Sequence, residues 1–244
     1  MTRRRWQLLI VVLCSLATIA SWPALRQLLA PIVRTLRGDV TLAERITQLE
    51  PSVTRRLHQP LTAAGFRNLP PQLALVAFKD SRRLQVYGRT SDVDSWSFLT
   101  QYPILGASGH AGPKLLEGDR QVPEGLYAVE SLNPNSRFHV SIRLNYPNDF
   151  DRRMATADHR TPLGSDVMIH GDTASIGCLA MGDQAAEDLF VLTANAGNDN
   201  VQVLICPTDF RLTTTLAVPD KPAWLPTLYA ELRHQLDEFP QPSD

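Results

Sequence analysis

The sequence predicts an α+β protein, mainly β with a few helices, whose short strands form a sandwich or barrel. Short apolar runs recur between residues 73 and 208, and Pro- and Gly-rich connections separate them. Such spacing favours a mostly antiparallel sandwich or barrel over a doubly wound parallel sheet. With 244 residues the chain is long enough for one good-sized domain plus shorter segments.

The individual elements follow from two different periodicities. Alternating or continuous apolar runs predict strands at 73–78, 84–87, 125–129, 138–144, 166–170 and 201–206. Helical spacing predicts helices at 185–195 and through the tail from Leu225 to Phe239. Thr41 followed by Glu44 is a capping box that predicts a further helix start, and Pro51 is expected to break or restart that helix.

Four segments are expected along the chain: a membrane anchor or signal segment at 1–26, a helical stalk at 27–72, the β-rich domain at 73–208 and a helical tail at 209–244. Arg3, Arg4 and Arg5 precede twenty uncharged residues, a length that suits a membrane-crossing helix. The arginines predict that everything after the apolar run is exported. A cleaved signal peptide is the alternative.

Charge and cysteine content narrow the possible partners. The net charge is −1, with 24 basic and 25 acidic residues, so the balance gives no indication of nucleic-acid binding. Outside the N-terminal apolar run only Cys178 and Cys206 remain, which excludes a disulfide framework. Cys206 ends an apolar strand and is expected in the core. Cys178 lies in a polar, glycine-bearing loop, where an unpaired thiol invites a chemical role.

The stretch around Cys178 has the residue types of a cysteine nucleophile with its base. A predicted strand delivers His170 to its end, and a short loop returns with Cys178. A thiol needs a nearby imidazole or electropositive loop to be reactive. Gly177 permits close backbone approach, so the Gly177 and Cys178 amides are candidate oxyanion donors. Ser175 is a candidate for orienting the base or the substrate.

By spacing alone, two other interpretations stay open. A structural histidine beside a buried cysteine is as common as a catalytic pair. A zinc site could use His159, His170 and Cys178, but the sequence has no Cys-x-x-Cys or His-x-x-x-His pair to support it.

Several motifs together resemble one family. Ile169-His170-Gly171 followed by Ser175-x-Gly177-Cys178 resembles the signature of the YkuD-type L,D-transpeptidase catalytic domain, in a form similar to the YafK-like subgroup. Further motifs of that subgroup occur in the same order: Phe78-Lys79, Gly112-Pro113-Lys114, Glu117-Gly118-Asp119, Pro123-Glu124-Gly125-x-Tyr127, Asn133-Pro134-Asn135-Ser136 and Tyr146-Pro147-Asn148.

The resemblance implies a transferase that acts on peptidoglycan stem peptides at the periplasmic face of the inner membrane, or in the periplasm if the N-terminal segment is cleaved. It implies that Cys178 attacks the diaminopimelate carbonyl, that His170 is the base, and that an amine resolves the acyl-enzyme. Gly177, Ser175 and Gly171 would support the site. No metal or organic cofactor is expected. The expected partners are stem peptides, a wall-linked lipoprotein and the inner membrane.

Two departures from the family pattern leave the reaction open. Ile176 stands where the family usually has a second histidine, and Ala180 stands where it has an arginine. A hydrolase that releases lipoprotein or D-alanine is therefore one alternative, and a non-catalytic wall-binding module is another.

Three further residues are candidate stem-peptide contacts: Lys114, Asp119 and Tyr127. The alternative is that they only shape turns and strands of the domain.

Overall fold

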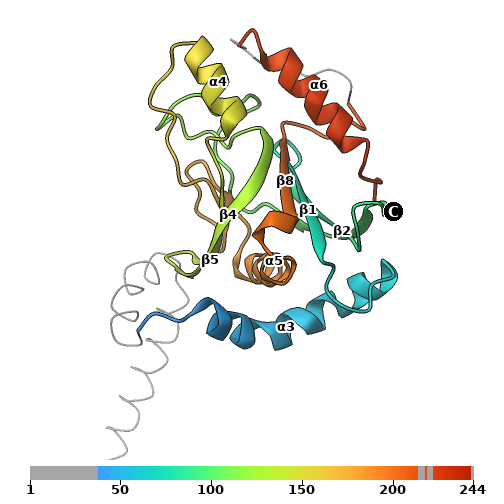
Figure 1. The fold of residues 1–244 in the computed structure, drawn as a ribbon. Coiled ribbons are helices and arrows are strands. Elements are labelled where there is room, and N and C mark those ends of the chain that lie inside the picture. Colours follow the sequence, from blue (N-terminus) through green and yellow to red (C-terminus); the bar gives the residue numbers. More distant parts are fainter. Residues whose placement is uncertain (1–37, 214–217, 219–221, 243–244) are drawn as a thin grey trace, which may run out of the picture.

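The protein forms a mixed eight-stranded sheet flanked by helices (Figure 1). The structure, a computed structural model, describes residues 38–213, 218 and 222–242. The predicted anchor or signal segment at 1–26 lies outside these residues, as does the first part of the predicted stalk. Within the described residues no helix has the length and apolarity needed to cross a membrane.

The sheet has the strand order β3-β2-β1-β8-β4-β5-β6-β7. Its strands are β1 Gln72–Phe78, β2 Arg83–Arg89, β3 Ser97–Pro103, β4 Gly125–Ser136, β5 His139–Leu144, β6 Met168–His170, β7 Leu179–Ala180 and β8 Val201–Cys206. The pairs β1–β8 and β6–β7 are parallel and the others are antiparallel. The α+β class is thus confirmed, but the strands form one sheet that bends into a half-barrel, with β4 shared by its two parts.

Four α-helices pack around this sheet in the described part of the chain. They are α3 Leu42–Ala63, α4 Asp149–Ala157, α5 Asp183–Ala196 and α6 Leu225–Leu236, with a short 3-10 turn at Asn198–Asn200. Figure 1 shows α5 between the sheet and α3, with α4 and α6 at the other end of the molecule. The sequence did not predict α4, although Asn148 and Asp151 form its capping box.

The two parallel strands β1 and β8 are buried on both faces. In β1, Leu73, Leu75 and Ala77 belong to the core shared with α3 and α5, whereas Ala74, Val76 and Phe78 belong to a second core under α6. Burial on both faces explains why these strands appear in the sequence as continuous apolar runs.

Helix α3 packs as part of the same core. Its capping box is confirmed, because the Thr41 hydroxyl accepts from the Glu44 amide and the Glu44 carboxylate accepts from the Thr41 amide. The expected break at Pro51 was wrong, since the helix continues through Pro51 and Pro60. An apolar stripe along the helix is buried against the domain and holds the helix in place: Leu49, Val53, Leu57, Leu61. Both prolines lie outside this stripe.

A buried ion pair fixes the loop that precedes β4. The Lys79 ammonium donates to the Gly112 and Val122 carbonyls, at 2.7 and 2.9 Å, and to the Glu124 carboxylate at 2.9 Å. Glu124 also accepts from the Gly112 amide and from the Tyr229 hydroxyl of α6. The loop between Gly112 and Val122 is therefore tied at its base to the sheet and to the C-terminal helix.

Removing one partner of this pair should unfold the protein readily. Lys79→Met leaves Glu124 buried and uncompensated, and such a change costs about 3–5 kcal/mol. The double variant Lys79→Met with Glu124→Gln should recover part of this loss, because no charge then stays buried. Urea unfolding of the three proteins tests the expectation. A free energy of unfolding for Lys79→Met within roughly 1 kcal/mol of the wild-type value would contradict it.

Candidate active site

The parallel pairing of β6 with β7 brings the two candidate catalytic residues to one face of the sheet. Ile169 pairs with Leu179, and His170 pairs with Ala180. Continued by one position, this register sets Cys178 beside Met168. Side chains two positions apart share a face, so Cys178 and His170 project the same way. Ile169 and Leu179 point into the core on the other face, where both are buried.

His170 is buried and has a defined tautomer. Its Nδ1 lies 2.6 Å from the Gly171 carbonyl oxygen. Because a carbonyl only accepts, Nδ1 carries the proton and Nε2 keeps its lone pair. The Phe138 ring stacks over the imidazole with centroids 4.5 Å apart. Burial lowers the pKa of His170, and the Gly171 hydrogen bond only partly opposes this. The imidazole is therefore neutral at pH 7 and ready to accept a proton.

Cys178 is partly exposed and its thiol is protonated. Burial raises the pKa of the Cys178 thiol, while a hydrogen bond with the Met168 backbone and the charge of Lys114 act in the opposite direction. The thiol donates to the Asp166 carbonyl at 3.5 Å. Within the described residues no hydrogen bond joins it to His170. The resting pair is thus a neutral thiol and a neutral imidazole.

The two predicted oxyanion donors are engaged in this structure. The Gly177 amide donates to the Ser108 hydroxyl at 2.7 Å, and the Cys178 amide donates to the Ser175 hydroxyl at 3.0 Å. The Ser175 hydroxyl in turn donates to the Cys178 carbonyl at 2.6 Å. Ser175 therefore closes the turn around the nucleophile and makes its contacts with that backbone.

Glycine is required at two positions of this loop. Gly177 has φ +98, and a Cβ there would lie 3.2 Å from the Gln121 carbonyl oxygen. A Cβ at Gly171 would lie 2.6 Å from the Phe138 carbonyl oxygen. Both glycines let the catalytic segment approach neighbouring backbone closely.

Comparison with known proteins decides the family. The family model described as the L,D-transpeptidase catalytic domain, YkuD, matches residues 73–203. The chain belongs to this family. Over 169 residues it is 34% identical to the protein named "Putative L,D-transpeptidase YafK" of Escherichia coli strain K12. That match covers 67% of this chain and 65% of the relative, and the protein of the same name from strain O157:H7 gives the same values.

Solved structures show only a remote likeness. The helical cell shape determining protein Pgp2 from Campylobacter jejuni is 19% identical, with a TM-score of 0.45 over 62% of this chain and 55% of that one. L,D-transpeptidase 1 of Mycobacterium tuberculosis is 15% identical, with a TM-score of 0.32 over 55% of this chain and 62% of that one. Likeness of this size carries no argument about the reaction.

Lys114 and Asp119 of this L,D-transpeptidase-family chain pair with each other beside the site. Their side chains lie 2.6 Å apart. Asp119 also accepts from the Leu115 and Leu116 amides, which folds the loop locally. Lys114 lies near enough to Cys178 to influence its pKa. Contact of either residue with a stem peptide stays a prediction.

Tyr127 shapes the core of the domain, which is the alternative that the sequence left open for it. Its side chain is buried in the core, and its hydroxyl donates to the Glu124 carbonyl at 3.2 Å and to Asp151 at 3.4 Å. Its position inside β4, facing the core, leaves no side-chain surface for a stem peptide in this structure. Tyr127 instead joins β4 to the start of α4.

Sequence reasoning missed three residues that shape the site: Ser108, Phe138 and Asp166. The Ser108 hydroxyl accepts a hydrogen bond from the Gly177 amide. The Phe138 ring packs against the His170 imidazole. Asp166 acts through its carbonyl, which every residue has, so no sequence signal marks it. Gly106, two residues before Ser108, forms a backbone bridge with Ala180, which places this loop against the catalytic segment.

The zinc alternative can be compared with the side-chain clusters. Across residues 38–213, 218 and 222–242, no group of three or more His, Cys, Asp or Glu side chains could hold a metal ion.

The protonation of Cys178 gives a testable pH profile. Because burial raises the pKa of Cys178, the rate of its alkylation by iodoacetamide should keep rising with pH beyond about 8.5, the ordinary pKa of a thiol. Mass spectrometry of the Cys178-bearing peptide reports this rate apart from other cysteines. His170→Ala should leave the profile of the free enzyme nearly unchanged. A rate that levels off below pH 7, and does so only with His170 present, would instead indicate a preformed thiolate–imidazolium pair.

Proposed function

We propose that this chain is a peptidoglycan L,D-transpeptidase-type cysteine acyltransferase that acts on diaminopimelate-containing stem peptides. The observation that carries the proposal is the β6–β7 register, which presents Cys178 and a neutral His170 on one face. Membership in the L,D-transpeptidase catalytic domain family supports the choice of substrate class.

The first half-reaction forms a thioester. Sγ of Cys178 leaves the Asp166 carbonyl and attacks the diaminopimelate carbonyl carbon, while the thiol proton passes to Nε2 of His170. The tetrahedral intermediate collapses as the carbon–nitrogen bond breaks. His170 then returns the proton to the departing amine, which in a tetrapeptide stem is the amine of D-alanine. The Gly171 carbonyl steadies the charged imidazole throughout.

Stabilising the oxyanion requires a change in the loop. The Gly177 and Cys178 amides donate to Ser108 and Ser175 in the resting protein. We infer that the substrate oxygen replaces at least one hydroxyl as the acceptor. One preorganised donor in such a site contributes about 2.7–4 kcal/mol to the barrier reduction.

The second half-reaction sets the product. An amine from another stem gives a cross-link, and water gives a free stem carboxylate. With water the enzyme is a carboxypeptidase if D-alanine was the leaving amine, or an amidase if a wall-linked lipoprotein was. In either case the acceptor loses a proton to His170 and attacks the thioester carbonyl. The carbon–sulfur bond breaks, and His170 returns the proton to the departing Cys178 thiolate.

The proposed location rests on the N-terminal sequence. Arg3, Arg4 and Arg5 before the apolar run favour an anchor with the domain on the periplasmic side of the inner membrane. Such an anchor would keep the site close to the wall and to lipoproteins attached to it.

Product analysis tests the proposal. The detergent-solubilised full chain is incubated with purified muropeptides and with lipoprotein-bearing sacculi, and the products are identified by mass spectrometry. Loss of D-alanine with new cross-links is expected for wild type and not for Cys178→Ala. Cys206→Ala is the matched control, because Cys206 is buried under α6 and away from the site. Its activity should stay close to that of wild type.

Each other outcome has a distinct meaning. Water-capped peptides or freed lipoprotein, again dependent on Cys178, would make the chain a hydrolase of the same mechanism. Identical spectra from wild type and Cys178→Ala would contradict catalysis and leave a wall-binding module.

A further inference from the structure

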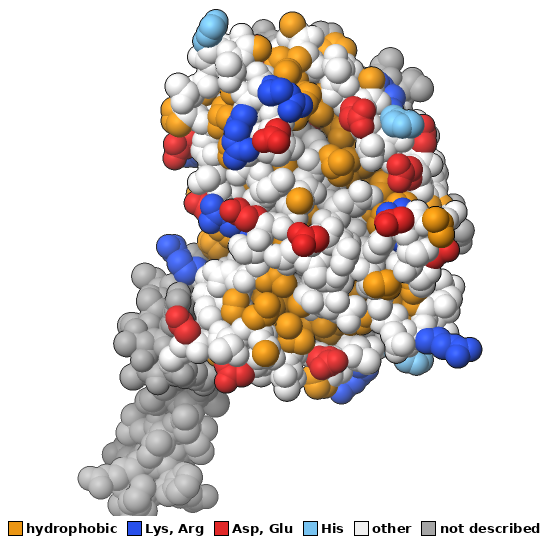
Figure 2. All heavy atoms as spheres, viewed as in Figure 1, with side chains coloured by type: hydrophobic (Ala, Val, Ile, Leu, Met, Phe, Trp, Pro, Cys, Tyr) orange, Lys and Arg blue, Asp and Glu red, His pale blue; other side chains and the backbone are white. Residues whose placement is uncertain are grey.

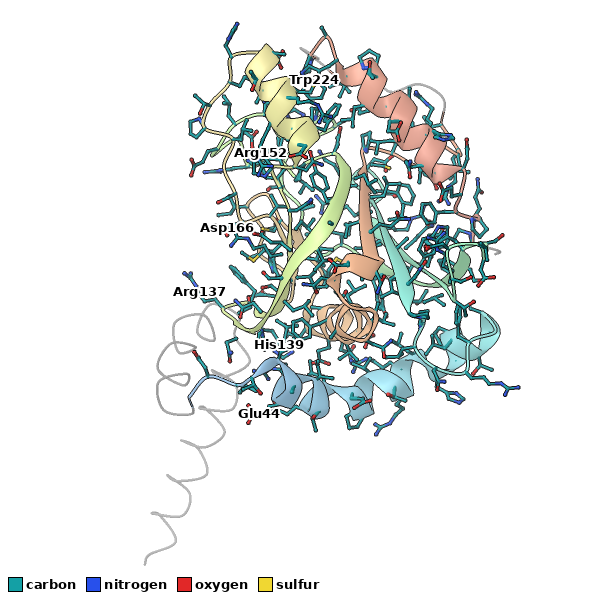
Figure 3. All side chains as sticks on the ribbon, in the orientation of Figure 1. Glu44, Arg137, His139, Arg152, Asp166 and Trp224 are labelled. Carbon is teal, nitrogen blue, oxygen red and sulfur yellow. The ribbon has the colours of Figure 1, made fainter. Side chains whose placement is uncertain are left out.

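The described structure has a hollow of about 540 Å³ whose lining includes neither Cys178 nor His170. It lies between the β4–β5 strands and the start of α4, and its lining includes Glu130, Arg143, Arg152 and Ser165. Ser165 adjoins Asp166, whose carbonyl accepts from the Cys178 thiol. Figure 3 shows Asp166 and Arg152 along one flank of the molecule. Asp166 thus links the site to the hollow, because its carbonyl contacts the Cys178 thiol and its carboxylate contacts Arg143.

The sheet register aligns Arg143 with Cys178. Ser131 pairs with Arg143, Arg143 pairs with Met168, and Met168 lies beside Cys178 in the continued β6–β7 register. Residues in one such row share a face of the sheet. Arg143 and Cys178 are thus two strand spacings apart, about 10 Å between backbones.

The Arg143 guanidinium is held between two carboxylates, and 38% of the arginine side chain is exposed to solvent. Nη1 lies 2.8 Å from Asp166 Oδ1, and Nε lies 2.8 Å from Glu130 Oε2. These are ion-pair distances without hydrogen-bond alignment, and Nε is buried with no hydrogen-bond partner in the described structure. About half of each carboxylate side chain is exposed, 52% for Glu130 and 57% for Asp166. Figure 2 shows acidic and basic side chains next to one another on this flank.

A guanidinium between two carboxylates suits a ligand that carries both charges. The planar fork of arginine binds a carboxylate through two parallel hydrogen bonds. Glu130 and Asp166 can accept from an ammonium group on the same carbon. The chemistry matches the end of a free amino acid, in which carboxylate and ammonium share one α-carbon.

We propose that Arg143, with Glu130 and Asp166, binds the free amino-acid end of the diaminopimelate side arm. This inference rests on the proposed function and adds the residues that select its substrate. The reacting carbonyl carbon and the far carboxylate carbon of diaminopimelate are six carbon–carbon bonds apart, roughly 7–8 Å when extended. That reach fits the row from Cys178 to Arg143. Arg143 thereby supplies a positive charge in a site where position 180 is alanine.

The inference predicts a specific substrate preference. Lysine equals diaminopimelate without the far carboxylate, so a lysine stem retains the ammonium and loses the partner of Arg143. Stems with diaminopimelate should therefore bind more tightly than otherwise identical lysine stems, by on the order of ten- to a hundred-fold in Kd.

Calorimetric binding to the full-length Cys178→Ala protein measures this preference without turnover. The probes are two synthetic tetrapeptide stems that differ only in diaminopimelate or lysine at the third position. Adding Arg143→Ala should weaken binding of the diaminopimelate stem and leave the lysine stem nearly unchanged, so that the Kd ratio falls close to one. Arg143→Lys should restore part of the ratio. Arg153→Ala, on an exposed residue of α4 outside the hollow, should preserve it.

Three results would overturn the inference: equal Kd values for the two stems, equal weakening of both stems by Arg143→Ala, or loss of the ratio in Arg153→Ala. Thermal melts of each variant show whether Arg143 is instead needed for folding. Turnover of the wild-type chain is followed in parallel. If the wild-type chain shows no turnover but still prefers the diaminopimelate stem in Kd, only the proposed reaction is contradicted. If it turns over substrate but binds both stems with equal Kd, only the proposed subsite is contradicted.

Discussion

The pairing of β6 with β7 is the constraint on which the site depends. The two strands are short, and the core side chains Ile169 and Leu179 fix their register. A slip of one residue would turn Cys178 toward the core and Leu179 outward, because side chains alternate along a strand. Burial of those two side chains therefore orients the nucleophile and the base. Because β5 pairs with β6, it also sets the position of Arg143 relative to Cys178. Gly106 pairs with Ala180 and covers the outer edge of β7.

Burial then sets the protonation of the pair. It raises the pKa of the Cys178 thiol and lowers that of His170, so both shifts favour the uncharged forms. Charge develops only when substrate arrives, and the neutral resting site suits a proton transfer coupled to attack. The loop before β4 carries Lys114, which lies near Cys178. The buried Lys79–Glu124 ion pair holds the two ends of this loop in place.

Much of this architecture could be predicted from the sequence, because burial on both faces made β1 and β8 continuous apolar runs. The two-residue strand β7 was too short for any periodicity, and α3 continued through its prolines because tertiary packing outweighed their local effect. His170 and Cys178 stood out as residue types, and the β6–β7 register shows how they share a face. Roles carried by backbone atoms, such as the Asp166 carbonyl, left no trace in the sequence. The motif position of Tyr127 could not decide between substrate contact and a structural role, because it says nothing about which face of β4 the side chain occupies.

The central claim is that this register makes Cys178 an acyl-accepting nucleophile served by His170. Intact-mass analysis of the full chain, acid-quenched during its first turnovers with a diaminopimelate tetrapeptide, tests it most directly. The account predicts an acyl adduct on the Cys178 peptide, with one D-alanine released per adduct, and no adduct in His170→Ala. Products that form without an adduct, or an adduct on another residue, would contradict the account.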